Sequence, residues 1–512
     1  MNNSRTMNSL KNIIAGFGGQ FITLLTGFIN RIIFVRVLSE AYLGVNGLFT
    51  NVLTMLSLTE LGISTAITYA LYKPLAKNDT EKVATLMHFY KSAYTIIGII
   101  VGILGICLLP LLKYIISDPG NIKENLYIIY IIFLFNTTIG YFYSYKTSLI
   151  IADQKNYIVS IISYSVILVQ SIFQILILLI TKNYIVYLIC QSIGTVMTNI
   201  LISRKANKLY PYLKNKDIHP LTKKDKKSLF VNIKALVIVK LSGVLVNSTD
   251  NIIISATKGL GLVSTGVASN YNLLVSTLNT VLNQIFSGIT ASVGNLNAIE
   301  SNERKKEFFD IINLMNFWLY GWCTVSFIFL ATDIVNLLFG QKYILSTVVV
   351  IIIAINFYTV GMQNAVWTYK NTLGLFDYGK YLTLLTGLIN IVLSIFLGQK
   401  LGLFGIFAAT LISRVLTNIW YDPYAVFKYG LKRNIKEYTE KYVYYLIVLI
   451  ITISAIYFTI SFFQFQFFGK LIVCIFLPHC IFFVFFYRFK ECNYLLNKVF
   501  FILRKFVSSI KN

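Results

Sequence analysis

The chain has 512 residues, of which 56% are hydrophobic and only 13% are charged, and its mean hydropathy is +0.70. A soluble globular protein carries about 25% charged residues, so this composition excludes an ordinary soluble enzyme. The net charge of +25 would suggest nucleic-acid binding in a soluble chain, but no folded basic domain accompanies that charge here.

Apolar runs of about 20 residues recur along the whole chain, and each is long enough to cross a bilayer. The first run is too long for the core of a signal peptide, so we expect it to remain as the first helix. The sequence predicts an all-α integral membrane protein with about fourteen transmembrane helices. In chain order they span residues 10–35, 42–70, 84–112, 122–143, 157–180, 184–203, 229–255, 263–293, 308–331, 344–367, 381–397, 401–420, 441–461 and 468–487.

The placement of basic residues predicts the orientation of these helices. Most of the 45 lysines and arginines fall in the segments on one side, which the positive-inside rule assigns to the cytoplasm. An even number of helices puts both termini on that side. The longest loop there, RKANKLYPYLKNKDIHPLTKKDKK (204–227), is strongly basic, and we expect it to contact anionic lipid headgroups. The basic, amphipathic tail after Tyr487 is expected to lie along the same surface.

The two halves of the chain resemble each other at an offset of about 220 residues. SLKNIIAGF (9–17) aligns with SLFVNIKAL (228–236), and FINRIIF (28–34) aligns with STDNIII (248–254). Secondary transporters are often built from such repeats, with the binding site between them. We therefore predict an N-terminal six-helix lobe (1–203), a basic cytoplasmic linker (204–228), a C-terminal six-helix lobe (229–430), and two additional helices with a basic cytoplasmic tail (431–512).

Four predicted helices, two from each half, carry polar residues on one face. In the seventh helix, residues spaced i, i+7 and i+11 share a face, and they are Lys240, Asn247 and Asn251. The eighth helix shows a similar stripe of Asn272, Ser276, Asn279 and Asn283. The matching positions of the first and second helices include Gln20, Gly27, Arg31, Ser57, Glu60 and Ser64. Lipid does not tolerate such faces, so they predict either a cavity lining or hydrogen bonds between helices.

Charged residues inside the helices are candidates for binding, since each costs about 2.5–3.5 kcal/mol at a helix centre. Lys240 lies roughly 16 Å into its helix, and is either functional or part of a structural ion pair. Glu60 either pairs with a base or carries a coupling ion, and Asp250 is placed to neutralise Arg31. The other basic residues within helices are Lys91, Lys234 and Arg414. Basic residues at the midplane suit an anionic substrate.

Catalytic or nucleotide-driven chemistry finds little support in the sequence. The three histidines are far apart, and the six cysteines lack the spacing of a metal site or a disulfide framework. No ATP-binding domain is visible, so transport must run on an ion gradient, on substrate supply or downhill. We expect no enzyme activity and no cofactor, with H⁺ or Na⁺ left open as a coupling ion.

Four segments resemble the bacterial polysaccharide-transport flippases. RVLSEAYLGVNGLFTNVLTMLSLTELGISTAITYALYKPLAKND (36–79) is similar to their N-terminal signature. TDNIIIS (249–255) and SNYNLLVSTLNTVLNQI (269–285) resemble the start of their second half. Residues 371–430 are similar to their eleventh and twelfth helices with the following loop.

This resemblance implies a member of the multidrug/oligosaccharidyl-lipid/polysaccharide exporter superfamily, with two MATE-like six-helix lobes, a central cationic cavity and alternating access. The implied substrate is an undecaprenyl-pyrophosphate-linked oligosaccharide, the repeat unit of O-antigen, capsule or another surface polysaccharide. The implied location is the bacterial cytoplasmic (inner) membrane. We expect a monomer that contacts membrane lipids and works with a polysaccharide polymerase and glycosyltransferases, with no nucleic-acid partner.

Other functions stay open at this stage. A drug or metabolite antiporter of the same superfamily is one alternative. A peptidoglycan-precursor flippase is another, although those relatives use several cavity arginines, and this chain offers Arg31 and a lysine. A membrane polymerase or ligase would need a large outer loop, which is absent from the predicted topology, and a structural scaffold would not need the polar stripes.

If the protein is such a flippase, we expect Lys240 and Arg31, one from each lobe, to hold the pyrophosphate. A pyrophosphate cannot enter a low-dielectric region without compensating cations. The asparagines that would bind sugar hydroxyls are Asn247, Asn251, Asn272, Asn279 and Asn283. Asp250 and Glu60 would keep the empty cavity near neutrality or couple an ion. The next candidates for the anion site are Lys91, Lys234 and Arg414.

Overall fold

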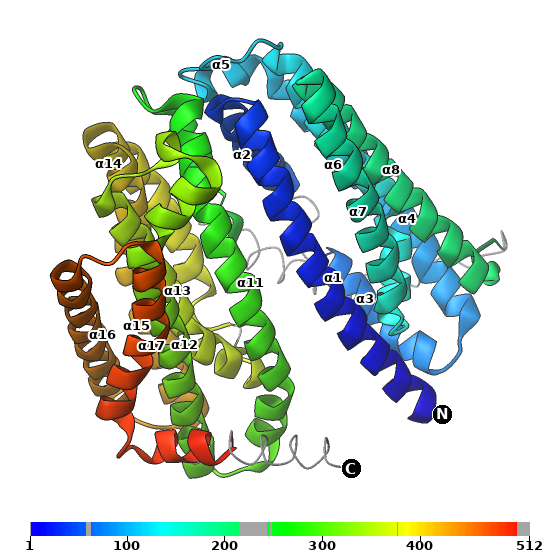
Figure 1. Cartoon of the computed structure of the whole chain (residues 1–512). Helices are drawn as coiled ribbons and strands as arrows, with labels where there is room; N and C mark the ends of the chain where they lie inside the picture. The colour runs from blue at the N-terminus through cyan, green and yellow to red at the C-terminus, as the bar shows by residue number, and fades with distance from the viewer. Residues whose placement is uncertain (1, 58–62, 215–242, 246–247, 376, 499–512) are drawn as a thin grey trace, which may run out of the picture. The chain divides into compact units, whose positions relative to one another are not determined.

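The computed structural model describes residues 2–57, 63–214, 243–245, 248–375 and 377–498 (Figure 1). Within these ranges the regular elements are helices, and ten helical segments are long and apolar enough to cross a membrane. The predicted all-α membrane class is confirmed. The chain divides into two compact units, Met1–Val267 and Ala268–Asn512.

The helices of the first unit lie at the predicted positions, but several are longer than predicted. The first begins at Asn2 instead of residue 10, the fourth ends at Ala152 instead of residue 143, and the sixth ends at Leu209 instead of residue 203. The third predicted helix, 84–112, ends its α-helical part early at Cys107, just before Pro110, which lacks a backbone N–H. The predicted helix 42–70 appears as α2 and α3, with residues 58–62 outside the described ranges. Only residues 243–245 and those from 248 onward of the predicted helix 229–255 are described. The elements are α1 (Asn2–Val37), α2 (Glu40–Leu56), α3 (Ile63–Ala76), α4 (Thr80–Cys107), η2 (Leu109–Leu111), α5 (Leu112–Ile115), α6 (Leu126–Ala152), α7 (Asn156–Thr181), α8 (Tyr184–Leu209), η3 (Pro211–Lys214) and α10 (Asp250–Ala256).

The second unit continues from a long helix, α11, whose first turns belong to the first unit. Its elements are α11 (Gly261–Ile299), α12 (Asn302–Phe339), η4 (Gln341–Tyr343), α13 (Thr347–Thr372), α14 (Lys380–Val415), α15 (Asn418–Ala425), the π-helical η5 (Val426–Leu431), α16 (Lys436–Phe463) and α17 (Phe467–Phe486).

The start of several helices is fixed by a side-chain cap. Asp79, Asn125, Asn183 and Ser301 each accept a hydrogen bond from a backbone N–H in the first turn of the helix that follows. Such caps satisfy donors that have no partner within the helix. The boundaries of α4, α6, α8 and α12 are therefore set by local chemistry as well as by hydropathy.

Small residues bring α4 and α6 close together. A Cβ placed on Gly98 would lie 3.2 Å from the Cβ of Tyr141, and one on Gly105 would lie 2.3 Å from a methyl group of Leu134. The two helices run antiparallel, because the glycine with the higher number meets the α6 residue with the lower number. Close approach of backbones over small residues is a common way to join membrane helices.

The element α14 is a helical hairpin rather than one straight helix. Gly402 has φ +59° and ψ −140°, which breaks the helix. Asn390 donates a hydrogen bond to Thr410 at 2.9 Å, although residues 20 apart in a straight helix would be about 30 Å apart. The hydroxyls of Thr386 and Thr417 also hydrogen-bond, at 2.7 Å. The predicted helices 381–397 and 401–420 correspond to the two arms of this hairpin, but the second arm ends at Val415, and residues 418–420 belong to α15.

Charged residues at one end of α12 join α16 and the segment after α17. The carboxylate of Asp310 lies 2.9 Å from the ammonium groups of both Lys306 and Lys441. Lys441 also pairs with Glu491 at 2.6 Å, and Lys306 with Glu437 at 2.5 Å. Burial opposes the charged form of Glu491, but hydrogen bonding to Lys441 and its charge outweigh burial and lower the pKa of this carboxyl. The network fastens the last helices to the second unit.

A proline in α17 is compensated by side chains of α12. Pro478 has no N–H to give to the carbonyl of Cys474, four residues earlier. That carbonyl instead accepts hydrogen bonds from the indole of Trp322 at 3.0 Å and from the hydroxyl of Ser326 at 3.3 Å. The helix partner therefore supplies donors that the α17 backbone lacks.

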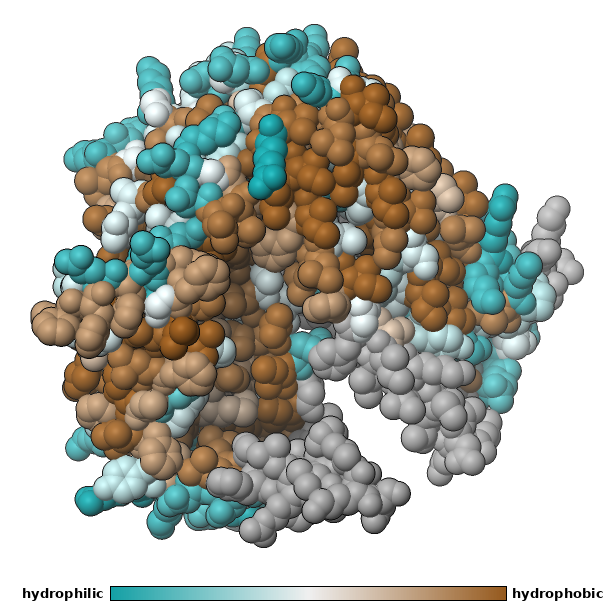
Figure 2. Space-filling model, viewed as in Figure 1, coloured by the Kyte–Doolittle hydropathy of each residue, from teal (hydrophilic) through white to brown (hydrophobic). Residues whose placement is uncertain are grey.

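Large hydrophobic side chains lie exposed on the outer faces of the helices. Phe462 is 82% exposed, Ile180 is 79% exposed and Phe458 is 69% exposed. Figure 2 shows hydrophobic residues over much of the visible face and hydrophilic residues gathered towards its edges. Patches of this kind are rare on soluble monomers and mark contact with another apolar phase, which for these spans is the lipid bilayer.

Candidate functional site

Arg31 lies near the C-terminal end of α1, close to aromatic residues at the start of α8. The guanidinium of Arg31 is near enough to the hydroxyl of Tyr187 to interact with it electrostatically. The rings of Tyr187 and Tyr184 stack, with their centroids 6.1 Å apart. Tyr42 packs edge-on against Tyr184 at 5.1 Å and donates its hydroxyl to the carboxylate of Glu124. The sequence stripe identified Arg31 but missed this surrounding group of tyrosines and its carboxylate.

Asp250 and Asn251 begin α10, which packs against α2 within the first unit. A Cβ placed on Gly47 would lie 3.2 Å from the amide nitrogen of Asn251. Next to it, a Cβ on Gly44 would lie 1.9 Å from the backbone oxygen of Leu262, so only glycine fits there. Asn251 is therefore held in a tight helix contact in this conformation.

Asn272, Asn279 and Asn283 lie on α11 in the second unit, and none of them is fully buried. Asn283 is exposed and accepts a hydrogen bond of 3.3 Å from the amide of Asn364 on α13. Asn364 also donates to the hydroxyl of Tyr320 on α12 at 2.6 Å. Three helices thus place two amides and a phenol together, a set of donors and acceptors that suits sugar hydroxyls.

Other polar residues of the second unit act as hydrogen-bond links between helices. Asn316 donates to the backbone oxygen of Gly361 at 2.9 Å, and Asn356 donates to that of Phe407 at 2.8 Å. These contacts cross from α12 to α13 and from α13 to α14. These two asparagines, which lie outside the predicted polar stripes, therefore link neighbouring helices.

An ion pair that the sequence analysis missed joins α13 to α15. The ammonium of Lys370 lies 2.6 Å from the carboxylate of Asp422, and both side chains are largely buried. The indole of Trp367 donates to the other oxygen of Asp422 at 3.2 Å. A buried carboxylate needs such partners, so Lys370 serves here as a structural counterion.

Other candidates are placed separately or lie outside the described residues. Lys91 is exposed on α4, and Arg414 is half-buried in the last turn of α14. Residues outside the described ranges are Glu60, Lys234, Lys240 and Asn247.

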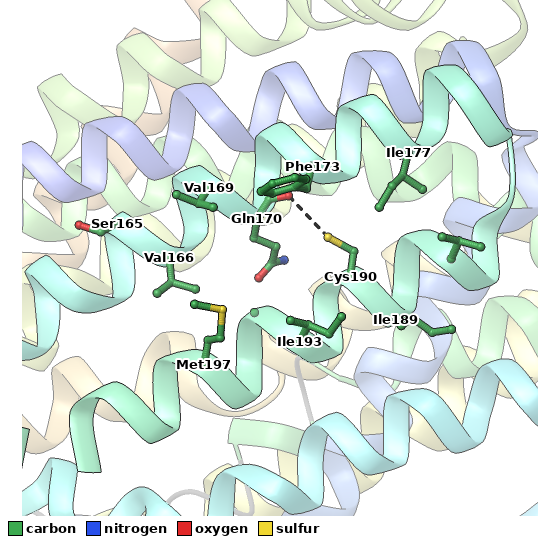
Figure 3. A pocket seen from close by; sticks show the side chains of 12 residues that line it. Ser165, Val166, Val169, Gln170, Phe173, Ile177, Ile189, Cys190, Ile193 and Met197 are labelled. Carbon is green, nitrogen blue, oxygen red and sulfur yellow. Dashed lines mark hydrogen bonds between the residues drawn. The ribbon is translucent and has the colours of Figure 1, made fainter. Parts of the chain in front are cut away.

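An apolar groove of about 480 Å³ lies between α7 and α8 (Figure 3). Val169 and Phe173 line it from α7, and Ile189, Ile193 and Met197 line it from α8. It offers no cation to an anionic headgroup, and apart from Ser165, Gln170 and Cys190 its lining side chains are apolar and favourable to a hydrocarbon chain. The groove therefore suits lipid tails and is distinct in chemistry from an anion site.

The comparisons with known proteins point to one family and one fold. The sequence model of a family described as "Polysaccharide biosynthesis protein" matches residues 9–293. A solved structure of the lipid II flippase MurJ in an inward closed conformation is similar, with a TM-score of 0.65 and 16% identity, covering 93% of this chain and 98% of that chain. An inward-facing multidrug resistance MATE family transporter of the MOP superfamily gives a TM-score of 0.57 at 14% identity, covering 80% and 95%. A Vibrio cholerae MATE transporter, VcmN, gives 0.56 at 12% identity, covering 85% and 99%. No curated protein matches the chain in sequence.

Proposed function

Because the chain belongs to the polysaccharide biosynthesis protein family, we propose that it is a flippase for undecaprenyl-pyrophosphate-linked oligosaccharide repeat units. The flippase would move these units across the bacterial cytoplasmic membrane for surface polysaccharide synthesis. One observation carries the proposal: a member of this family is similar in fold, over 93% of its length, to a flippase of lipid II. In the proposed function, the polar head of the substrate crosses the bilayer while its lipid tail stays within it.

The basic residues within the predicted helices support an anionic head as the transported group. Arg31 and Lys240 are proposed to hold the pyrophosphate, since arginine offers a bidentate fork and lysine a point charge. Asn272, Asn279 and Asn283, together with Asn364, would bind the sugar. Asp250 and Glu60 would balance the charge of the empty site, and H⁺ or Na⁺ is the proposed coupling ion.

Two alternatives of the same superfamily are separated by what accumulates when the protein is lost. A drug or metabolite antiporter would leave the surface polysaccharide intact and raise drug sensitivity. A peptidoglycan-precursor flippase would leave that precursor on the inner leaflet. Loss of the proposed flippase would leave the lipid-linked oligosaccharide on the inner leaflet. The glycosyltransferases and the polymerase would act on opposite faces of the membrane, so the block would lie between their steps.

The test is deletion in the native host, followed by measuring on which leaflet the lipid-linked glycan accumulates. We expect inner-leaflet accumulation, loss of surface polysaccharide and unchanged drug sensitivity. Complementation with Lys240→Ala should fail although the protein inserts normally, whereas Lys240→Arg should restore part of the transport. If both Lys240→Ala and Arg31→Ala transport normally, the anion site lies elsewhere, and Lys91, Lys234 and Arg414 become the candidates.

A further inference from the structure

Two lysines of the first unit lie together at one end of its helix bundle. On α6, the ammonium of Lys146 donates a hydrogen bond of 2.6 Å to the hydroxyl of Ser203 on α8. Its charge is also close enough to that of Lys91 on α4 for the two to repel. The glycine contacts place the two lysines at a similar level in the bundle: Gly98 faces Tyr141 across the two antiparallel helices. Lys91 and Lys146 then differ by only about 3 Å along the bundle axis.

The two charges lack an anionic partner within the described part of the chain. Lys146 contacts two neutral groups, the hydroxyl of Ser203 and the ring of Tyr145, whose centroid lies 5.7 Å from its ammonium. Among the described residues, neither Lys91 nor Lys146 forms an ion pair with a carboxylate. Ser203 itself is 8% exposed, so the acceptor is part of the packed bundle. Two like charges within membrane-spanning helices are costly without an anion between them.

The depth of the pair matches the headgroup region of a leaflet. Lys146 lies six residues before Ala152, the last residue of α6, which places its Cα about 9 Å from that helix end. A lysine at this depth can extend its ammonium to the interface. By the distribution of lysine and arginine, this end of the unit is the one predicted to be cytoplasmic.

Arg31 lies at the opposite end of the same unit. It is next to Tyr187 near the start of α8, whereas Ser203 is near the end of that helix. The 16 residues between them correspond to about 24 Å along α8. The first unit therefore carries separate positive sites at its two ends.

We propose that Lys91, Lys146 and Ser203 form a binding site for the phosphate of a membrane lipid at the cytoplasmic leaflet. The inference rests on the proposed function in one respect: the phosphate is that of the undecaprenyl-pyrophosphate carrier, bound here before it reaches Arg31. The two ammonium groups supply the charge, and the Ser203 hydroxyl, freed from Lys146 or rotated, can donate to a phosphate oxygen.

The test measures lipid binding without transport. The full chain is placed in nanodiscs of phosphatidylcholine that contain either undecaprenyl pyrophosphate or phosphatidylglycerol, and retained lipid is counted by native mass spectrometry. The variant Lys91→Gln/Lys146→Gln should bind undecaprenyl pyrophosphate at least about tenfold more weakly, the loss expected for charge-assisted hydrogen bonds. The control Lys205→Gln removes an exposed charge two residues after Ser203 and should bind as the wild type does. Lys146→Arg should retain most of the binding.

The outcomes separate the source of the phosphate from the existence of the site. If the wild type retains phosphatidylglycerol and the double variant does not, the site stands and takes a bilayer phospholipid. If both lipids are retained equally by the wild type and the double variant, the proposal is overturned. The double variant also loses the hydrogen bond from Lys146 to Ser203, so thermal unfolding is measured for each variant and lipid binding is compared per folded molecule. A wild type that binds the carrier but does not flip its glycosylated form would overturn the proposed function and leave this site in place.

Discussion

Asn283 and Asn316 show the two uses of an amide in a membrane helix. Asn283 is exposed on α11 and meets another side chain, Asn364. Asn316 is fully buried on α12 and donates to the backbone oxygen of Gly361. The first leaves atoms available for a ligand, whereas the second is committed to joining two helices.

This difference predicts opposite effects of the same substitution. Asn283→Ala should lower transport of the oligosaccharide and leave thermal unfolding nearly unchanged, because an exposed amide contributes little to packing. Asn316→Ala should lower the free energy of unfolding by about 1–3 kcal/mol, since it removes a buried hydrogen bond. Thermal unfolding in detergent and flipping in proteoliposomes measure the two effects. Loss of stability in the Asn283 variant with transport intact per folded molecule would assign it to helix linkage instead.

Sequence spacing could identify Asn283 but not the residues that it meets. Residues at i, i+4 and i+7 of one helix share a face whatever the rest of the chain does. Asn364 lies 81 residues further along the chain, and Lys146 and Ser203 are 57 apart. Such contacts depend on which helices pack together, and that information is not contained in the period of any one helix.

At the scale of the element, Pro478 and Trp322 form a unit that a double-mutant cycle can test. In the wild type, Trp322→Phe should cost about 1–3 kcal/mol, because the Cys474 carbonyl loses its nearer donor. In a Pro478→Ala background the alanine N–H can bond that carbonyl, so the same substitution should cost clearly less. Unfolding free energies of the four proteins give the coupling. Equal costs in both backgrounds would show that the indole contributes by packing alone.

Hydropathy predicted most helix positions because the bilayer sets the length that each span needs. The two arms of the α14 hairpin, predicted as 381–397 and 401–420, follow from this rule. The π-helical η5 and the compensation of Pro478 do not follow from it. These depend on single residues and on neighbouring helices, which an average over a window removes.

At the scale of the whole molecule, the chain forms two compact units whose boundary, after Val267, falls within α11. The repeat at an offset of about 220 residues predicts two six-helix lobes, and that division remains a prediction. Family membership and the similar transporter folds agree with a protein that spans the membrane many times. Its orientation rests on the distribution of lysine and arginine alone.

Cysteine labelling across α8 tests that orientation with one helix between the two sites. Lys182 lies in the short turn before α8, and Asn215 follows α8 in the sequence, within the predicted basic loop. If α8 crosses the membrane once, cysteines at these positions must be on opposite sides. The background should carry Cys107→Ser, because Cys107 is an exposed native thiol at the end of α4.

With a membrane-impermeant maleimide on intact cells, we expect Lys182→Cys to be labelled and Asn215→Cys to be protected until the cells are permeabilised. The reason is that the positive-inside rule places the loop 204–227 in the cytoplasm. Labelling at 215 with protection at 182 would invert the orientation and place Lys91 and Lys146 at the outer leaflet, where they would meet the carrier after transport. Labelling at both positions would show that α8 does not cross, and would contradict the predicted helix count.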